Sequence, residues 1–216
     1  MTYYTKNFKM KSENTYIGDD KFKKFLDHYS CPTPIEIVKM RFIGAVCSPN
    51  EELRPTDVIA SLWTDGKTPR LETKNEAQLF FKFFMGLWDE MFHAVLQNDI
   101  ALPKIKNSDD LLTCCTQRYN EIEQGFLEGF WGGCENLKLP AYIAQVLDSL
   151  TDLSGVYHKL AEKTHLSKDK KSLFDAIIDC DRMVNKSIRF LVENYALPHM
   201  EKITASAHNG EKNGYN

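Results

Sequence analysis

The stretch "KNEAQLFFKFFMGLWDEMFHAVLQ" (74–97) most strongly constrains how this chain can fold. Its apolar residues recur every three or four positions, which is the period of an α-helix and not of a β-strand. One broad arc of the helix holds Ala77, Phe80, Phe81, Phe84, Leu87, Trp88, Met91, Phe92 and Val95. Leu79 and Phe83 widen this arc, so the helix is either covered on two sides or partly exposed to a partner. We favour internal burial.

The same period recurs along most of the chain, and start signals precede several of the helices. Thr33, followed by Pro34 and Glu36, predicts a cap and a first helical residue, and Thr73 with Glu76 forms a second capping box. Ser108, Ser167 and Pro140 mark further starts. We expect helices over 19–29, 34–47, 74–97, 109–131, 140–163 and 168–195. No strand alternation bounded by turns occurs. The predicted fold is all-α, a single bundle of about six to seven helices without a significant sheet.

Composition limits the domain organisation and the class of partner. We expect one helical domain over 19–203, an N-terminal arm over 1–18 and a disordered tail over 204–216. The net charge of −3 provides no general attraction for nucleic acid or an anionic membrane. No stretch approaches the roughly 20 apolar residues of a membrane span. The six cysteines include no CxxC pair, and no signal peptide is evident, which indicates a reducing cytoplasm.

The segment "YNEIEQGFLEGFWGG" (119–133) places glycines inside a predicted helix. Gly125 and Gly129 fall along one edge of its core side, while Glu121 and Glu128 are expected farther round, towards solvent. Small residues four positions apart let a neighbouring backbone approach closely. We therefore interpret this edge as a helix-packing or interaction edge. It is not a phosphate loop, because such a loop precedes a helix. The pair 132–133 is expected to end the helix.

Two Glu-x-x-His spacings raise the alternative of a metal site. Glu90 with His93 and Glu162 with His165 match a spacing used in carboxylate-bridged helical metal centres. The helical wheel, however, places the first pair on a polar face, and the second pair lies where its helix should end. Chance spacing is the better explanation, and we expect neither a metal nor another cofactor.

Two other charged features stand out. Asp181 falls inside the apolar stripe of the last helix, and a buried carboxylate needs a partner or a raised pKa. A neighbouring arginine is the more common explanation than a functional site. Residues 109–135 are also acidic, with only Arg118 as a cation, and an acidic helix face can select a basic protein partner. The acidic residues are Asp109, Asp110, Glu121, Glu123, Glu128 and Glu135.

Two segments resemble a known family. "MRFIGAVCSPNEELRPTDVIASLW" (40–63) resembles the first signature of the YecA/YgfB-like family of bacterial proteins. "RYNEIEQGFLEGFW" (118–131) is similar to its later G-F-L-x-G signature, and the similarity spans about residues 33–133. The resemblance implies an all-α fold without an established enzymatic activity. Many relatives end in a cysteine-rich zinc-binding motif, whereas this chain has only Cys180 after Cys134.

The sequence therefore predicts a cytoplasmic, non-catalytic helical protein that binds an unidentified protein partner, in a regulatory or interaction role. Neither nucleic acid nor membrane is expected as a partner, and a homodimer is compatible with the sequence. The alternative function is a metal-dependent helical enzyme that uses the carboxylates and imidazoles of the two Glu-x-x-His pairs.

Overall fold

The computed structural model describes residues 15–63, 67–106, 110–134, 136–164 and 169–202. These residues form helices and their connections, and no strand occurs among them. The all-α prediction is confirmed. Residues 1–14 of the expected arm and the whole expected tail (204–216) lie outside the described residues, whereas Tyr16 and Ile17 of the arm pack against the core.

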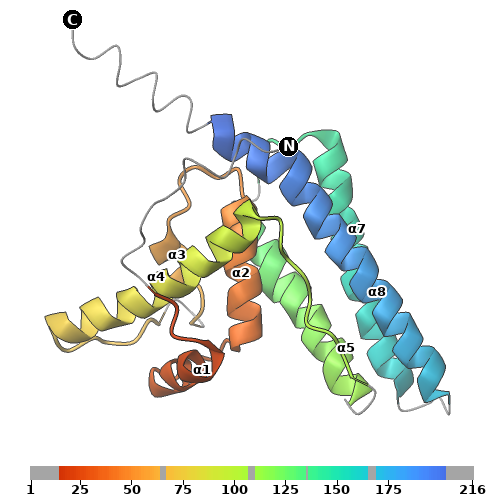
Figure 1. Cartoon of the computed structure of the whole chain (residues 1–216), viewed down its shortest axis with the longest axis horizontal. Coiled ribbons are helices and arrows are strands. Elements are labelled where there is room, and N and C mark those ends of the chain that lie inside the picture. The colour runs from red at the N-terminus through yellow and green to blue at the C-terminus, as the bar shows by residue number, and fades with distance from the viewer. Residues whose placement is uncertain (1–14, 64–66, 107–109, 135, 165–168, 203–216) are drawn as a thin grey trace, which may run out of the picture.

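The helices follow one another along the chain, and the longest connections precede and follow the helix at 74–96 (Figure 1). Their bounds are α1 Asp19–His28, α2 Ile35–Cys47, α3 Pro55–Ala60, α4 Lys74–Leu96, α5 Leu111–Asn120, the π-helix η2 Glu121–Leu127, α6 Glu128–Trp131, α7 Ala141–Thr164, α8 Lys170–Leu191 and the π-helix η3 Val192–Ala196. The elements α5, η2 and α6 are continuous and are called the α5–α6 rod below. Helix α2 packs against both this rod and α4, whereas α7 packs against α5 and α8. The rod therefore lies between α2 and the α7–α8 pair.

An aromatic cluster joins α4 to the N-terminal helices. The Phe84 ring meets Phe22 of α1 at 5.4 Å and Phe42 of α2 at 6.3 Å between centroids. One side of α4 is therefore core, and burying each large ring contributes about 1.5–3 kcal/mol. Leu79 and Phe81 remain 49% and 40% exposed. The predicted broad arc is thus mostly buried, with two members open to solvent.

Side-chain caps determine where three of the helices begin. Thr73 accepts a hydrogen bond from the Glu76 N–H at 3.1 Å, as its capping box predicted. Asp110 caps α5, and Asp169 caps α8, through their carboxylates. The predicted cap residues 108 and 167 lie outside the described residues. Both helices begin two residues later than predicted, because an aspartate closer to the helix supplies the cap.

The predicted start of α2 is wrong in one respect. Thr33 does not cap the helix; its hydroxyl donates to the Leu62 carbonyl at 2.7 Å. Pro34 has ψ 150° and precedes the helix, which begins at Ile35. The Thr33 hydroxyl therefore makes a tertiary contact with the residues that follow α3, instead of the N-terminal cap of α2 that the sequence pattern predicts.

No helix among the described residues is both long and apolar enough to cross a bilayer.

Candidate functional site

Three glycines bring α2 and the α5–α6 rod into backbone contact. A Cβ added at Gly129 would lie 2.1 Å from the carbonyl oxygen of Arg41, and one at Gly44 would lie 2.1 Å from that of Phe126. A Cβ at Gly125 would lie 2.7 Å from the Met40 Cβ. Only glycine fits at such separations. The edge formed by Gly125 and Gly129 therefore faces another helix of the same chain.

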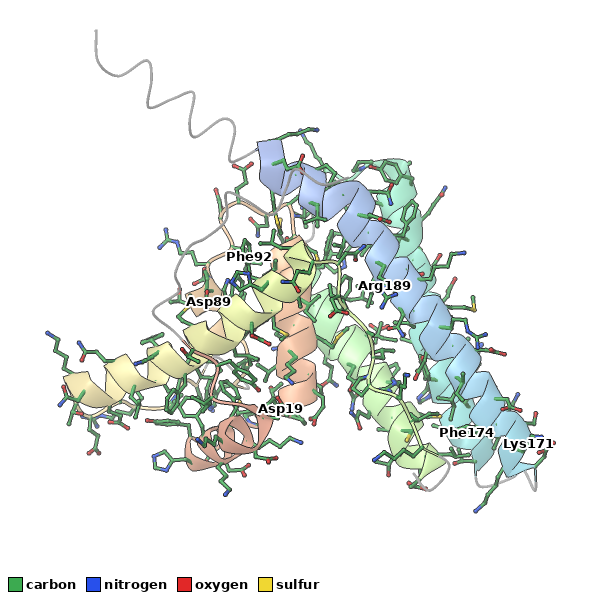
Figure 2. The ribbon with its side chains drawn as sticks, in the orientation of Figure 1. Asp19, Asp89, Phe92, Lys171, Phe174 and Arg189 are labelled. Carbon is green, nitrogen blue, oxygen red and sulfur yellow. The ribbon has the colours of Figure 1, made fainter. Side chains whose placement is uncertain are left out.

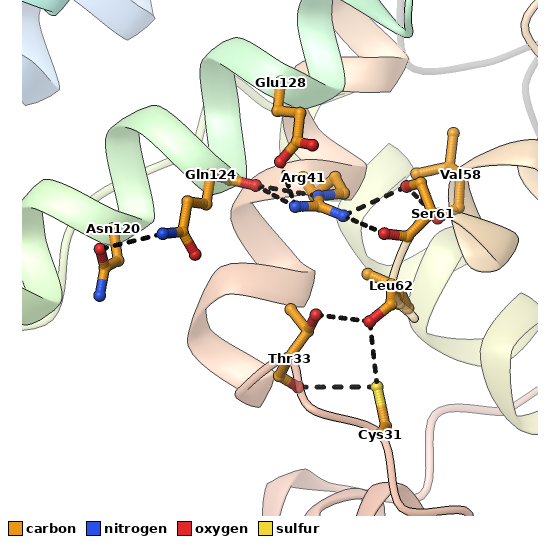
Figure 3. A network of polar contacts seen from close by, with 9 residues as sticks. All are labelled: Cys31, Thr33, Arg41, Val58, Ser61, Leu62, Asn120, Gln124 and Glu128. Carbon is orange, nitrogen blue, oxygen red and sulfur yellow. Dashed lines mark hydrogen bonds and ion pairs between the residues drawn. The ribbon is translucent and has the colours of Figure 1, made fainter. Parts of the chain in front are cut away.

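Within this crossing, Arg41 binds the π-helical turn of the rod (Figure 3). The Glu128 N–H donates to the carbonyls of Glu123, five residues back, and Gly125, and not to that of Gln124 as in an α-helix. The Gln124 carbonyl instead accepts from Arg41 Nε at 2.9 Å and Nη2 at 2.6 Å. Arg41 Nη1 donates to the Ser61 carbonyl at 2.7 Å. The guanidinium thus replaces a backbone partner that π-helical geometry removes.

A second buried arginine joins the rod to α7, α8 and the connection before α5. Arg118 Nη1 donates to Glu121 Oε2 at 2.7 Å, and its Nε donates to Asp181 Oδ1 at 3.1 Å. Its Nη2 donates to the Pro103 carbonyl. The Tyr157 hydroxyl donates to Asp181 at 2.7 Å. The guanidinium therefore joins three segments directly, and Asp181 adds α7 through Tyr157. We call these side chains the Arg118 network.

The charges of this network explain its pKa shifts. Burial raises the pKa of Glu121 above its ordinary value of 4.5, and Asp181 adds to the rise against the opposing effect of Arg118. Burial and the same aspartate raise the pKa of the Tyr157 hydroxyl, which stays protonated and donates to that carboxylate. The network is buried and its polar groups bond to one another. It therefore positions helices and offers no open position to a substrate.

The two glutamates of the predicted packing edge differ in solvent exposure. Glu128 is 55% exposed, as expected, and binds Arg41. Glu121 is 1% exposed, so its predicted solvent position is wrong. The rod is covered by α2 on one side and by the α7–α8 pair on another, which widens its buried surface, and Arg118 supplies the compensating charge. Asp181 is buried as its stripe predicted, with an arginine as partner.

The predicted acidic face is also largely taken up within the molecule. Glu121 and Glu128 pair with arginines, Glu123 accepts from the Ser154 hydroxyl, and Asp110 caps α5. Residues 109 and 135 lie outside the described residues. Of these four described carboxylates, Glu121 and Glu128 are therefore paired with cations, whereas Glu123 and Asp110 accept from neutral donors.

The residues of the alternative metal site are not brought together. Glu90 and His93 are exposed on α4. Glu162 is 68% exposed on α7 and lies 3.8 Å from His158. His165 lies outside the described residues. Across the part of the chain that the structure describes, no three His, Cys, Asp or Glu residues lie close enough to hold a metal ion.

The outer face of α8 carries an open groove of about 470 Å³. Figure 2 shows Arg189 on the side of α8 nearest the C-terminal end of α4. Arg189 Nε donates to the Ile100 carbonyl at 3.1 Å, and Asn185 Oδ1 accepts from the Leu102 N–H at 2.8 Å. The lining residues, called the α8 groove below, are Arg182, Asn185, Lys186, Arg189, Phe190 and Glu193.

Sequence reasoning missed both the buried arginines and the groove. Arg41 carried a usable signal, because it stands inside the almost wholly apolar run "IVKMRFIGAVC" (37–47). A cation in such a run needs a buried partner. The α8 groove carried no comparable signal, since cations on a solvent-facing stripe are ordinary and the 97–106 connection that anchors two of its side chains has no periodicity.

No family model, curated protein or solved structure matches this chain.

Proposed function

We propose that this chain is a non-catalytic helical protein that acts in the cytoplasm by binding another protein. The observation that carries the proposal is the set of large apolar side chains exposed on the long helices. Among them, the rings of Tyr142 on α7 and Phe190 on α8 lie 6.5 Å apart between centroids, and aromatic side chains are enriched at protein interfaces. The exposed residues are Leu79 and Phe81 on α4, Tyr142 and Val156 on α7, and Met183 and Phe190 on α8.

The buried polar groups support a binding role over a catalytic one. Arg41 and Arg118 are each bonded to backbone carbonyls and carboxylates in the interior, where they hold helices together. A catalytic group must instead reach a substrate in a cleft. The raised pKa values of Glu121 and Tyr157 in the Arg118 network are therefore explained by packing.

The cysteines support the proposed compartment. None of the six forms a disulfide: Cys47, Cys115 and Cys180 are buried, and the other three are half-buried. Free thiols persist in a reducing compartment. The resemblance of residues 33–133 to YecA/YgfB-like proteins, which we also propose as the family, agrees with a non-catalytic role. No observation favours the metal-dependent alternative, because Glu90, His93 and Glu162 point to solvent.

Affinity capture of the full-length tagged protein tests the proposal. We expect at least one protein to co-purify reproducibly at physiological salt and to re-form a complex from purified components, as measured by sedimentation velocity. Absence of any reproducible partner, or a captured protein that fails to bind once purified, would contradict it. A homodimer detected in the same sedimentation runs would identify self-association as the alternative assembly.

A further inference from the structure

We propose that the α8 groove docks an acidic, amphipathic helix of a partner protein. This inference rests on the proposed function and names the chemistry of its partner. The carboxylates of that helix would pair with Arg182, Lys186 and Arg189, and its apolar side would cover Phe190.

The spacing of the three cations fits a helix. Arg182, Lys186 and Arg189 stand at positions i, i+4 and i+7 of α8, so they lie on one side and span about 10 Å along its axis. Among the described residues, Glu193 is the carboxylate that lines the groove, and Arg182 Nη1 donates to Asp179 Oδ1 at 2.7 Å on the same helix, so a partner carboxylate at Arg182 must compete with this exposed pair. A partner helix with carboxylates at the same intervals can place one opposite each cation, as in the flanking charge pairs of coiled coils.

The groove is partly ordered before any partner binds. Arg189 is tethered by its Nε to the Ile100 carbonyl, and Asn185 is tethered by its Oδ1 to the Leu102 N–H. Side chains that are already held lose less rotamer freedom on association. Because the tether of Asn185 uses its acceptor oxygen, its amide NH₂ group remains the donor that can face an incoming carboxylate.

An apolar strip beside the cations distinguishes this groove from a simple charged surface. Phe190 is 41% exposed and its ring meets that of Tyr142 edge-on at 6.5 Å, while Met183 is 56% exposed. Aromatic and arginine side chains dominate the energetics of many interfaces. An amphipathic acidic helix satisfies both the cations and this strip.

A protein partner fits these features better than nucleic acid. Phe190 lines the groove and Met183 is exposed beside it, and neither side chain gains anything from contact with phosphates. The apolar side of an amphipathic helix would instead cover both of them. Nucleic acid is therefore an outcome for the test to detect.

The test uses fluorescence anisotropy with the full chain. The probe is a fluorescein-labelled peptide of three heptads of Glu-Leu-Ala-Glu-Glu-Leu-Ala, which carries carboxylates at i, i+4 and i+7. We expect saturable binding, weakened about tenfold or more by Arg182→Glu/Lys186→Glu and weakened also by Phe190→Ala. The matched control, Lys21→Glu/Lys24→Glu on α1, changes the net charge equally and should leave binding unaltered. All the substituted side chains are exposed, so the fold is expected to persist, and circular dichroism verifies it.

Each other result overturns the inference. No binding by the wild-type chain, or equal weakening by the α1 control, would show that the groove does not recognise this chemistry. Tighter binding of a single-stranded DNA oligonucleotide would identify nucleic acid as the ligand. A wild-type dimer that Arg182→Glu/Lys186→Glu dissociates in sedimentation velocity would identify a second copy as the occupant. If a captured partner still binds both the Arg182→Glu/Lys186→Glu variant and the α1 control variant, the docking inference is overturned. The proposed function would then still stand.

Discussion

Gly129→Ala is the sharpest test of the close crossing between α2 and the α5–α6 rod. The new methyl group would meet the Arg41 carbonyl oxygen at 2.1 Å, its carbon at 2.8 Å and its Cα at 3.0 Å. Ordinary contact begins near 3.4 Å, so the two backbones must separate by about 1.3 Å. Backbone atoms cannot turn aside as the end of a flexible side chain can.

The expected cost combines three effects. Overpacking costs about 3 kcal/mol, the upper part of its usual range, because the contact is with backbone. Lengthening the bonds from Arg41 to the Gln124 carbonyl costs about 1 kcal/mol more. Alanine regains about 1 kcal/mol of helix propensity. We therefore expect the free energy of unfolding to fall by about 3 kcal/mol.

Urea unfolding at 25 °C measures this change through the midpoint at constant slope. Gly155→Ala on α7 is the matched control, because nothing lies within 4 Å of the added methyl group, and it should stabilise by up to about 1 kcal/mol. Gly125→Ala should fall between the two, because its nearest atom is the Met40 Cβ at 2.7 Å. If Gly129→Ala proves as stable as the wild type, the reasoning about this crossing is refuted.

Three further predictions concern buried groups. Arg118→Met should lower the free energy of unfolding by about 3–5 kcal/mol at pH 8, since it leaves the Glu121 and Asp181 carboxylates without their cation. The loss should be smaller at pH 5, and an equal loss at both pH values would argue against this reasoning. Burial raises the pKa of Glu121, so its contribution to stability is present below about pH 4.5 and declines as pH rises through the folded value. Glu121→Gln should therefore gain stability relative to wild type from pH 4.5 to 8 in urea titrations, and a relative loss would contradict the sign. Burial raises the pKa of Cys115 to about 11, so iodoacetamide at pH 8 should modify half-buried Cys134 well before Cys115. Mass spectrometry of the digested protein measures the order of modification, and earlier modification of Cys115 would contradict this prediction.

Local signals in the sequence were sufficient for most of the fold. The period of 74–97 and the Thr73 cap specify α4 almost to the residue, because both act within one or two helical turns. Gly132, with φ 53°, ends α6 as its position after the apolar run predicted. Thr33 shows the limit of such signals, since its hydroxyl serves the Leu62 carbonyl, 29 residues away.

The candidate site was less predictable because its partners come from distant segments. A helical wheel assigns one buried side, yet the α5–α6 rod is covered by α2 and by the α7–α8 pair, so Glu121 is buried against Arg118. A helical wheel with a period of 3.6 residues cannot predict the π-helical turn at 121–127. It therefore cannot predict that Arg41 donates to the Gln124 carbonyl there. Asp181 was recognisable as buried, but its partner was not.

Site-specific photo-crosslinking tests the central claim, that this chain acts by binding another protein, most directly. A benzoylphenylalanine side chain replaces Met183 on the outer face of α8 in the full-length protein, and a matched variant carries it at exposed Lys24 on α1. After irradiation in the cells that produce the protein, we predict a discrete heteromeric adduct from Met183→benzoylphenylalanine that is absent from the Lys24 variant. Adducts only of the chain with itself, or none above the Lys24 background, would contradict the claim.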